Sequence, residues 1–249
     1  MDLGLHGRSA LVTGAAGGIG SAIAVALAQE GCDVALLDAE RSAALQVAAD
    51  SVRQHGVRAR LVQADVRDFA RAQQVVDEVT AHFGGLDILV CSAGVTRDGV
   101  SWKLSEEDWD DVLAVNLKGC FNYARAVVPA LRARGGGSII GIGSINGLRG
   151  KFGQVNYAAS KAGLIGLAKA LAREVGRFGI TVNVVAPGMT ETPLTAALPA
   201  AVRDAAVQES LLGRICAPAD IADAVLFLAS QRARQITGDV LRVDAGQYV

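Results

Sequence analysis

The sequence predicts an α/β fold in which one parallel sheet is covered by helices on both faces. Short apolar runs of strand length alternate with longer amphipathic segments along the chain, as happens where a helix joins each strand to the next. The chain has 249 residues, of which 51% are hydrophobic, enough for the core of one large α/β domain. No linker, repeat or low-complexity segment divides it. We therefore expect residues 1–249 to form a single domain.

Seven apolar runs predict seven strands. The expected strands are residues 9–13, 32–37, 58–63, 86–91, 138–143, 180–185 and 239–243. The segments between them predict helices. The first expected helix ends near residue 30. The others span residues 69–83, 105–134, 154–178 and 218–229. After the sixth strand the pattern loosens over residues 189–215, with one short helical stretch, and an insertion there is expected to form a substrate lid.

A glycine-rich turn follows the first strand and opens the first helix. It reads Gly14-Ala-Ala-Gly17-Gly18-Ile19-Gly20, which differs in spacing from the strict G-x-G-x-x-G pattern. Glycines at such a turn let the backbone bend tightly, approach a pyrophosphate and present helix N–H groups to it. A strand before the turn and a helix after it therefore favour nucleotide binding over a purely structural role.

The acidic residue at the end of the second strand indicates which nucleotide binds. Asp38 lies 18 positions after Gly20, where a carboxylate accepts hydrogen bonds from both ribose hydroxyls and repels a 2′-phosphate. Gly17 offers no basic side chain to that phosphate, whereas Arg41 is the one residue that favours it. We predict NAD rather than NADP as the cofactor.

Two further loops follow strands and are expected to line the same crevice. Asp65 and Val66 follow the third strand, and Ser92, Ala93 and Gly94 follow the fourth. In a doubly wound sheet, ligands bind at the carboxyl ends of the strands, so these residues are expected near the adenine and its ribose. An alternative for Asp65 is that it is only an acidic residue before a helix.

The candidate catalytic residues lie around the fifth strand and the helix after it. Tyr157 and Lys161 are four positions apart, so on a helix they share one face. A nearby ammonium favours the phenolate and would lower the tyrosine pKa from about 10, which suits a general acid or base. Ser144 ends the fifth strand and is placed to donate a hydrogen bond to the reacting oxygen. Asn116, in the apolar middle of a long helix, needs buried partners and can hold a kink or a water.

Composition argues against several other kinds of protein. The 24 basic and 25 acidic residues form no basic stripe, so no nucleic-acid partner is expected. The four cysteines and three histidines lack ligand spacing, so no metal site is expected. The N-terminus carries no charged-then-apolar leader and no apolar run approaches 18 residues. We expect a cytoplasmic protein with no membrane partner.

Ordered motifs over nearly the whole chain resemble those of the short-chain dehydrogenase/reductase family. The matching residues are Thr13, Gly14, Gly18, Ile19, Gly20, Asp65, Val66, Ser92, Ala93, Gly94, Asn116, Ser144, Tyr157, Lys161, Pro187, Gly188 and Thr192. One departure is Cys91-Ser92, where the family often has two asparagines. The resemblance implies a Rossmann-type domain, a homotetramer and a catalytic tetrad of Asn116, Ser144, Tyr157 and Lys161.

The resemblance also implies a role for each member of the site. Tyr157 would exchange a proton with the alcohol or ketone oxygen of the substrate. Lys161 would lower the pKa of Tyr157 and hold the nicotinamide ribose. Ser144 would position the substrate carbonyl, and Asn116 would anchor a water. Thr192, after Pro187 and Gly188, would contact the carboxamide of the nicotinamide. The expected substrate-binding residues are Ser144, Asn146, Gln154, Tyr157 and Met189.

Within the family, the chain is most similar to reductases of 3-oxoacyl thioesters. Residues 95–98, 143–150, 153–157 and 171–175 carry this likeness. Those enzymes usually prefer NADPH, with a basic residue where this chain has Gly17, so Asp38 suggests an NAD-linked member acting on a 3-hydroxyacyl thioester or its 3-oxo form. Two alternatives remain: an NAD-dependent dehydrogenase of a small cyclic or aromatic secondary alcohol, and a cofactor-binding protein without turnover. An intact Ser144, Tyr157 and Lys161 argues against the second.

Overall fold

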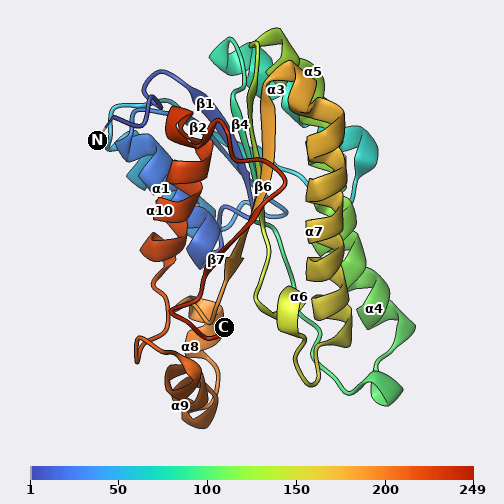
Figure 1. Cartoon of the computed structure of the whole chain (residues 1–249). Helices are drawn as coiled ribbons and strands as arrows, with labels where there is room; N and C mark the ends of the chain where they lie inside the picture. Colours follow the sequence, from blue (N-terminus) through green and yellow to red (C-terminus); the bar gives the residue numbers. More distant parts are fainter. Residues whose placement is uncertain (1) are drawn as a thin grey trace.

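A computed structural model of the chain, which describes residues 2–249, contains the predicted seven-stranded parallel sheet (Figure 1). The strands are β1 (Ser9–Thr13), β2 (Asp33–Asp38), β3 (Ala59–Gln63), β4 (Ile88–Cys91), β5 (Gly137–Ile142), β6 (Ile180–Pro187) and β7 (Val240–Val243). Their order across the sheet is β3-β2-β1-β4-β5-β6-β7. The order reverses between β1 and β4, so the loops that leave these two strands diverge and open a crevice there.

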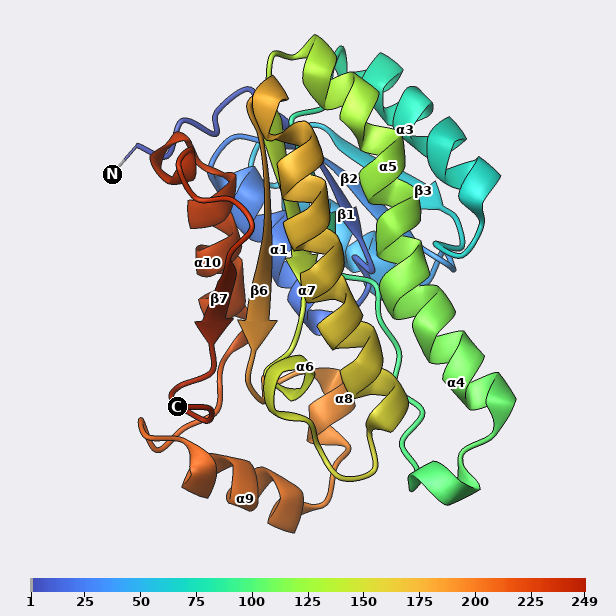
Figure 2. The ribbon, with the colours of Figure 1, turned by 45° about the vertical axis from the view of Figure 1, so that its right-hand side comes forward.

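Three helices cover each face of the sheet (Figures 1 and 2). On one face lie α1 (Gly18–Gln29), α2 (Ala43–Arg53) and α10 (Pro218–Ala229). On the other lie α3 (Phe69–Phe83), α5 (Gly119–Ala133) and α7 (Val155–Val175). Successive strand residues enter opposite apolar clusters: Val12 packs under α1, whereas Leu11 packs on the other side. Burial on both faces explains why the strands read as continuous apolar runs.

The helix α2 is absent from the sequence prediction. Ser42 accepts a hydrogen bond from the N–H of Leu45 and caps the helix. Leu45, Ala48, Ala49 and Val52 are buried at helical spacing, so the segment shows the usual amphipathic signal. Both features can be read in the sequence, and the prediction missed them.

The long helix predicted over residues 105–134 is interrupted at its centre. Ser105 caps α4 (Glu106–Leu113), and a π-helical turn (Ala114–Lys118) joins α4 to α5. Asn116 lies in this turn and is buried, at the position where the sequence predicts that its amide holds a kink. Such widened turns within α-helices frequently lie at functional sites.

Three short helices gather at the carboxyl end of the sheet, at the bottom of Figure 1. They are α6 (Asn146–Arg149) after β5, and α8 (Pro193–Ala196) and α9 (Ala200–Glu209) after β6. The predicted lid therefore holds two helices instead of one short stretch. The remaining elements are single 3-10 turns: η1 (Ser101–Lys103), η3 (Gly176–Phe178) and η4 (Gln231–Ala233).

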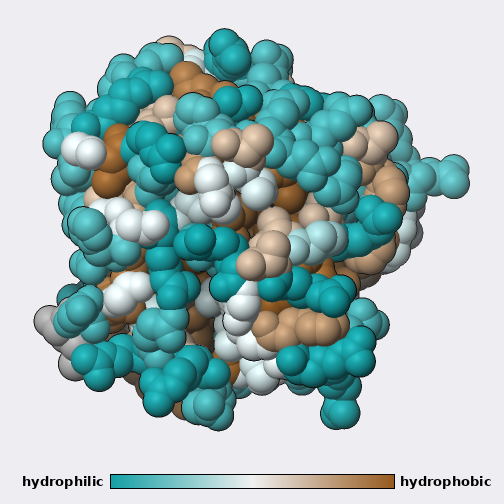
Figure 3. Space-filling model, turned by 90° about the horizontal axis from the view of Figure 1, so that it is seen from above, coloured by the Kyte–Doolittle hydropathy of each residue, from teal (hydrophilic) through white to brown (hydrophobic). Residues whose placement is uncertain are grey.

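The opposite end of the molecule, from which the strands start, is covered mostly by hydrophilic residues (Figure 3). Among residues 2–249, none of the helices combines the length and the apolar character that a bilayer crossing needs.

Candidate active site

A cavity of about 1580 Å³ lies at the carboxyl end of the sheet, between the glycine-rich turn, α6, α7 and the lid. Nearly all the predicted site residues line it. They are Gly14, Gly17, Gly18, Ile19, Gly20, Asp38, Asp65, Val66, Ser92, Ala93, Gly94, Ser144, Asn146, Gln154, Tyr157, Lys161, Pro187, Gly188, Met189 and Thr192. Asn116 is the one predicted residue outside the lining. The structure therefore brings predicted residues from both halves of the chain together around one cavity.

The glycine-rich turn is closed by backbone contacts that exclude larger residues. Gly14 has φ +67°, and a Cβ there would lie 2.6 Å from Ala93 Cα. A Cβ at Gly20 would lie 2.2 Å from Gly14 O. The N-cap of α1, Gly17, provides no side-chain hydrogen bond to the first turn. The N–H groups at this helix end therefore face the cavity without a side-chain partner, which fits the pyrophosphate of a dinucleotide.

Asp38 is fixed at the end of β2 by two backbone N–H groups. Its Oδ2 accepts from Ala16 N at 2.9 Å and its Oδ1 from Ala39 N at 2.8 Å. Asp38 and Glu40 belong to the cavity lining, whereas Arg41 does not. The carboxylate thus tethers the glycine-rich turn and faces the space where a nucleotide ribose would lie.

The loop after β3 carries an ion-pair network that the sequence prediction missed. Arg67 Nη2 lies 2.6 Å from Asp65 Oδ2, and Arg67 Nη1 lies 2.9 Å from Asp111 Oδ1. Arg97 also pairs with Asp111, at 2.8 Å. The guanidinium of Arg67 lowers the pKa of the Asp65 carboxyl. Asp65 therefore lines the cavity, and its charge is already matched by Arg67.

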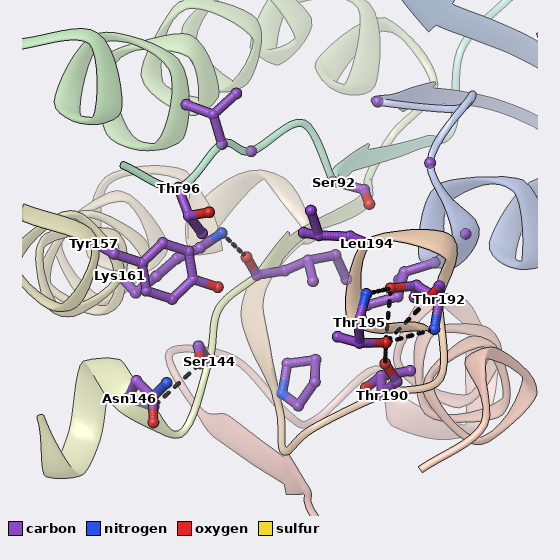
Figure 4. Close-up of a pocket in the computed structure, with 18 of the residues that line it drawn as sticks. Ser92, Thr96, Ser144, Asn146, Tyr157, Lys161, Thr190, Thr192, Leu194 and Thr195 are labelled. Atoms are coloured by element: carbon purple, nitrogen blue, oxygen red, sulfur yellow. Dashed lines mark hydrogen bonds between the residues drawn. The ribbon is translucent and has the colours of Figure 1, made fainter. Parts of the chain in front are cut away.

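Tyr157, Lys161 and Ser144 meet on one side of the cavity (Figure 4). Helix α7 carries Tyr157 and Lys161 one turn apart, and the loop after β5 delivers Ser144. The N–H of Asn146 donates to Ser144 Oγ at 3.1 Å, which leaves the hydroxyl proton of Ser144 to be donated to Tyr157 or into the cavity. Lys161 Nζ donates to Ile142 O at 2.7 Å and lies 5.6 Å from the centre of the Tyr157 ring.

Burial dominates the pKa values of this pair. It raises the pKa of Tyr157, and the neighbouring Ser144 hydroxyl lowers it by a smaller amount. Burial also lowers the pKa of Lys161 from 10.5 to about 8. The predicted depression of the Tyr157 pKa by Lys161 does not hold in this structure. The reason is that the ammonium bonds to the Ile142 carbonyl while loss of water penalises the phenolate.

Asn116 holds the loop after β4 from behind. Its Oδ1 accepts from Val95 N at 2.8 Å, and its Nδ2 donates to Val95 O at 3.0 Å and to Ser160 Oγ at 3.1 Å. A Cβ added at Gly94 would lie 3.4 Å from Asn116 Oδ1 and 3.5 Å from Lys161 Nζ. The amide thus fixes the loop between itself and Lys161, which is a different contact from the water expected from the family resemblance.

Thr13, at the end of β1, holds the loop at Cys91-Ser92, where the sequence departs from the family pattern. Thr13 Oγ1 accepts from the N–H groups of Ser92 at 3.1 Å and Ala93 at 3.2 Å. Backbone groups therefore shape this loop, and the Ser92 side chain takes no part in these two bonds.

The first turn of the lid lies against the glycine-rich turn. Thr192 caps α8, and a Cβ added at Gly18 would lie 3.0 Å from Thr192 Cγ2. Thr195 Oγ1 donates to Thr190 O at 2.6 Å and locks this turn (Figure 4). Leu194, on the same turn, lies across the cavity from Tyr157.

A chain of amide and carboxylate groups forms the other wall of the cavity. Asn146 Nδ2 donates to Gln154 Oε1 at 3.0 Å, and Gln154 Nε2 donates to Asp98 Oδ2 at 2.9 Å. At the start of the lid, Met189 N donates to Gln247 Oε1 at 2.6 Å. Asp98 belongs to the stretch 95–98 that carries the likeness to oxoacyl thioester reductases, but neither Asp98 nor Gln247 was predicted as a site residue.

A parallel sheet whose glycine-rich turn shares one cavity with a tyrosine, a lysine and a serine defines an oxidoreductase that uses a nicotinamide dinucleotide. Residues 14–247 match the family described as enoyl-(acyl carrier protein) reductase. The chain belongs to the short-chain dehydrogenase/reductase family and is an enzyme that acts on an alcohol or ketone group.

Curated relatives cover almost the full length of the chain. The 3-oxoacyl-(acyl-carrier-protein) reductase FabG of Escherichia coli K12 is 43% identical over 247 residues, covering 99% of this chain and 100% of that protein. The enzyme of the same name from Staphylococcus aureus Mu50 is 41% identical over 242 residues, covering 97% and 98%. That from Thermotoga maritima is 41% identical over 245 residues, covering 98% and 99%.

Proposed function

We propose that this protein interconverts a 3-oxoacyl thioester and the 3-hydroxyacyl thioester with NAD(H) as cofactor, the thioester being that of coenzyme A or of a carrier protein. The observation that carries the proposal is a single cavity with the glycine-rich turn and Asp38 at one end and Ser144 and Tyr157 at the other. The printed substrate of the similar reductases favours an oxoacyl thioester over a small cyclic or aromatic alcohol.

Each catalytic side chain has a distinct task in this proposal. Ser144 donates its free proton to the carbonyl oxygen of the substrate, and Tyr157 gives a proton to the same oxygen as it becomes an alcohol. The raised pKa of Tyr157 keeps the phenol protonated near neutral pH, which is the form that reduction needs. Lys161, with a pKa of about 8, keeps most of its positive charge at pH 7 and offsets negative charge on the reacting groups. The bound nicotinamide supplies the hydride.

The other residues of the cavity hold the cofactor and the substrate in place. The helix end at Gly17 to Gly20 would bind the pyrophosphate, and Asp65, Val66 and the loop from Ser92 to Gly94 would enclose the adenosine. Pro187, Gly188 and Thr192 would hold the nicotinamide. On the substrate side, Asn146, Gln154 and Met189 would contact the thioester.

Charge around the ribose site supports NAD(H) over NADP(H). The carboxylate of Asp38 faces the cavity, and no basic side chain projects from Gly17. Arg67, an arginine of the lining, is already paired with Asp65 and Asp111. A 2′-phosphate would therefore meet the Asp38 carboxylate, and Arg41, the residue that would favour it, lies outside the cavity lining.

An acidic carrier protein would need clustered arginines to dock, and the cluster of Arg132, Arg134 and Arg177 does not lie at this cavity. Arg132 and Arg177 stack on the Phe178 ring, 4.0 Å and 4.7 Å from its centre, and Arg134 pairs with Asp87 at 2.9 Å. These residues lie where β5 and β6 begin, at the opposite end of the strands from the cavity. Within one chain they do not flank its mouth, so the proposal does not depend on them.

We also propose a homotetramer. Phe121 on α5 and Val155 on α7 are each 43% exposed, on the helices next to the site, and burial against a second copy would remove both from water. Light scattering should give the mass of four chains, and a monomer would contradict this part of the proposal.

The proposed function is tested with acetoacetyl-coenzyme A and either NADH or NADPH, following the loss of the reduced-nicotinamide absorbance. We expect turnover with NADH at the higher kcat/KM. Turnover of cyclic or aromatic alcohols with NAD, in the absence of any thioester activity, would overturn the substrate assignment. Faster turnover with NADPH would overturn the cofactor assignment.

A further inference from the structure

Arg149, which the sequence analysis did not single out, joins the catalytic loop to the lid. It ends α6, five residues after Ser144, and lines the cavity. Its Nη2 lies 3.1 Å from Glu209 Oε2 on α9, and its Nη1 donates to Gln247 O at 3.1 Å. Its Nε donates to Asn146 Oδ1 at 3.3 Å. One partly buried guanidinium thus contacts the lid, the C-terminal turn and α6.

Other attachments of the lid, to the C-terminal turn, are neutral hydrogen bonds. Gln247 accepts from Met189 N at one end of the lid and donates to Ala206 O on α9, at 3.0 Å. Ser210 Oγ donates to Ala245 O at 2.9 Å, just after α9. These bonds act as a hinge. The ion pair of Arg149 and Glu209 is the contact that pulls α9 toward the helix beside Ser144.

Helix α9 forms part of the substrate side of the cavity. Leu198 and Val202 line it, together with Ala205, Ala206 and Glu209. A movement of α9 away from α6 would therefore widen the cavity and expose these apolar side chains to water. The position of α9 sets how closely they pack on a substrate.

We propose that Arg149 is a positioning residue that, through Glu209, holds α9 closed over the substrate and so sets the affinity for the acyl thioester. This proposal rests on the proposed function. The hydrogen bonds from Asn146 to Gln154 and from Asn146 N to Ser144 Oγ do not involve Arg149. Loss of the pair should therefore weaken substrate binding and leave the chemical step nearly unchanged.

The kinetic test uses Arg149→Met, Glu209→Ala and the double variant, with acetoacetyl-coenzyme A as substrate. A partly exposed ion pair has a modest effect, so each single variant should raise KM by roughly three- to fivefold and change kcat by less than about twofold. The double variant should raise KM no further than either single variant, because both remove the same contact. Arg149→Lys, which keeps the charge, should recover part of the loss.

The matched control is Glu191→Ala. Glu191 lies 3.9 Å from Arg203 and forms the other ion pair of the lid, without touching Arg149 or Glu209. It should leave KM unchanged. Equal effects of Glu191→Ala and Glu209→Ala, an unchanged KM in Arg149→Met, or additive effects in the double variant would each overturn the proposal.

Limited proteolysis tests, without any turnover, whether the ion pair of Arg149 and Glu209 holds α9 in place. Trypsin cleavage after Arg203, within α9, requires that helix to open locally. We expect cleavage to be about threefold or more faster in Arg149→Met than in the native protein or in Glu191→Ala, as measured by mass spectrometry. Equal cleavage rates would overturn the proposal that this ion pair holds α9 in place. Inactivity of the native protein toward thioesters would overturn the proposed function alone.

Discussion

The nucleotide side and the substrate side of the cavity are built in different ways. On the nucleotide side the close contacts are between main-chain atoms: Gly14 and Gly20 lie against the backbone and leave no room for a side chain. On the substrate side the contacts are between side chains: Gln154 is hydrogen-bonded to Asp98, and Arg149 forms an ion pair with Glu209. The first arrangement tolerates almost no substitution, whereas the second can be altered one contact at a time.

This difference suggests a division of tasks. A dinucleotide has constant geometry, so a rigid backbone cradle suits it. Substrates vary among related enzymes, and a wall of side chains with a hinged lid can change without disturbing the cradle. The predictions below test where the boundary between the two sides lies.

The largest effect is expected at Tyr157, the proposed proton donor, where the two sides meet. Tyr157→Phe removes the proton donor, so turnover should fall by about 10³-fold while NADH affinity stays within about twofold. Steady-state assays and fluorescence titration of NADH measure the two quantities. The matched control is Tyr123→Phe, which removes a fully buried phenol outside the cavity lining and should keep its activity. Similar losses in both variants would contradict the assigned role.

The next effect concerns the charge of Lys161. Its pKa in the folded protein, about 8, is below its ordinary value of 10.5, so between these pH values the unfolded chain binds more protons than the folded one. Stability therefore rises with pH across this window, as the folded protein is relieved of a buried ammonium. Relative to Lys161→Met, the native protein should gain up to roughly 3 kcal/mol from pH 8 to 10.5. Urea unfolding of both proteins measures this.

Lys169→Met serves as the control for that measurement, because Lys169 is exposed on the same helix. Its stability difference from the native protein should stay constant over the same pH range. A Lys161→Met difference that is equally flat would show that the ammonium is not desolvated.

A smaller effect is expected at the glycine-rich turn. A Cβ at Gly20 would lie 2.2 Å from Gly14 O, so Gly20→Ala should cost about 1–3 kcal/mol of stability and weaken NADH binding more than tenfold. Gly166→Ala is the control, since a Cβ there meets nothing within 4 Å. Thermal unfolding and NADH titration compare them. Unchanged NADH binding in Gly20→Ala would remove the distinction between the two sides.

The smallest effect is expected from Asp38→Ala. Loss of the carboxylate should narrow the preference for NADH over NADPH by about tenfold in kcat/KM, because the repulsion of a 2′-phosphate disappears. NADH affinity should also fall, since Ala16 N loses its acceptor. An unchanged ratio would count against NAD(H) as the natural cofactor.

Sequence analysis could predict most of the fold and of the nucleotide side because both depend on local patterns. Apolar runs mark the strands, and a glycine cluster marks a turn that only glycines permit. Sequence analysis could not predict the contacts of Arg149, because this residue binds Gln247 and Glu209, which are 98 and 60 positions away along the chain. The pKa of Tyr157 was misjudged for a related reason: its direction depends on burial, which spacing alone does not reveal.

The π-helical turn at Asn116 has the form of a single-residue insertion within an otherwise regular helix. Its wider turn takes up the extra residue, because Gly119 N donates to Ala114 O, five residues back, where an α-helix would use the carbonyl four residues back. The buried face of α5, with Cys120, Tyr123 and Val127, therefore stays aligned with the sheet. Deleting one residue from the turn would restore an ordinary α-helical turn, so the loss would fall on the contacts of Asn116 with Val95 and Ser160 and not on the inner face of α5.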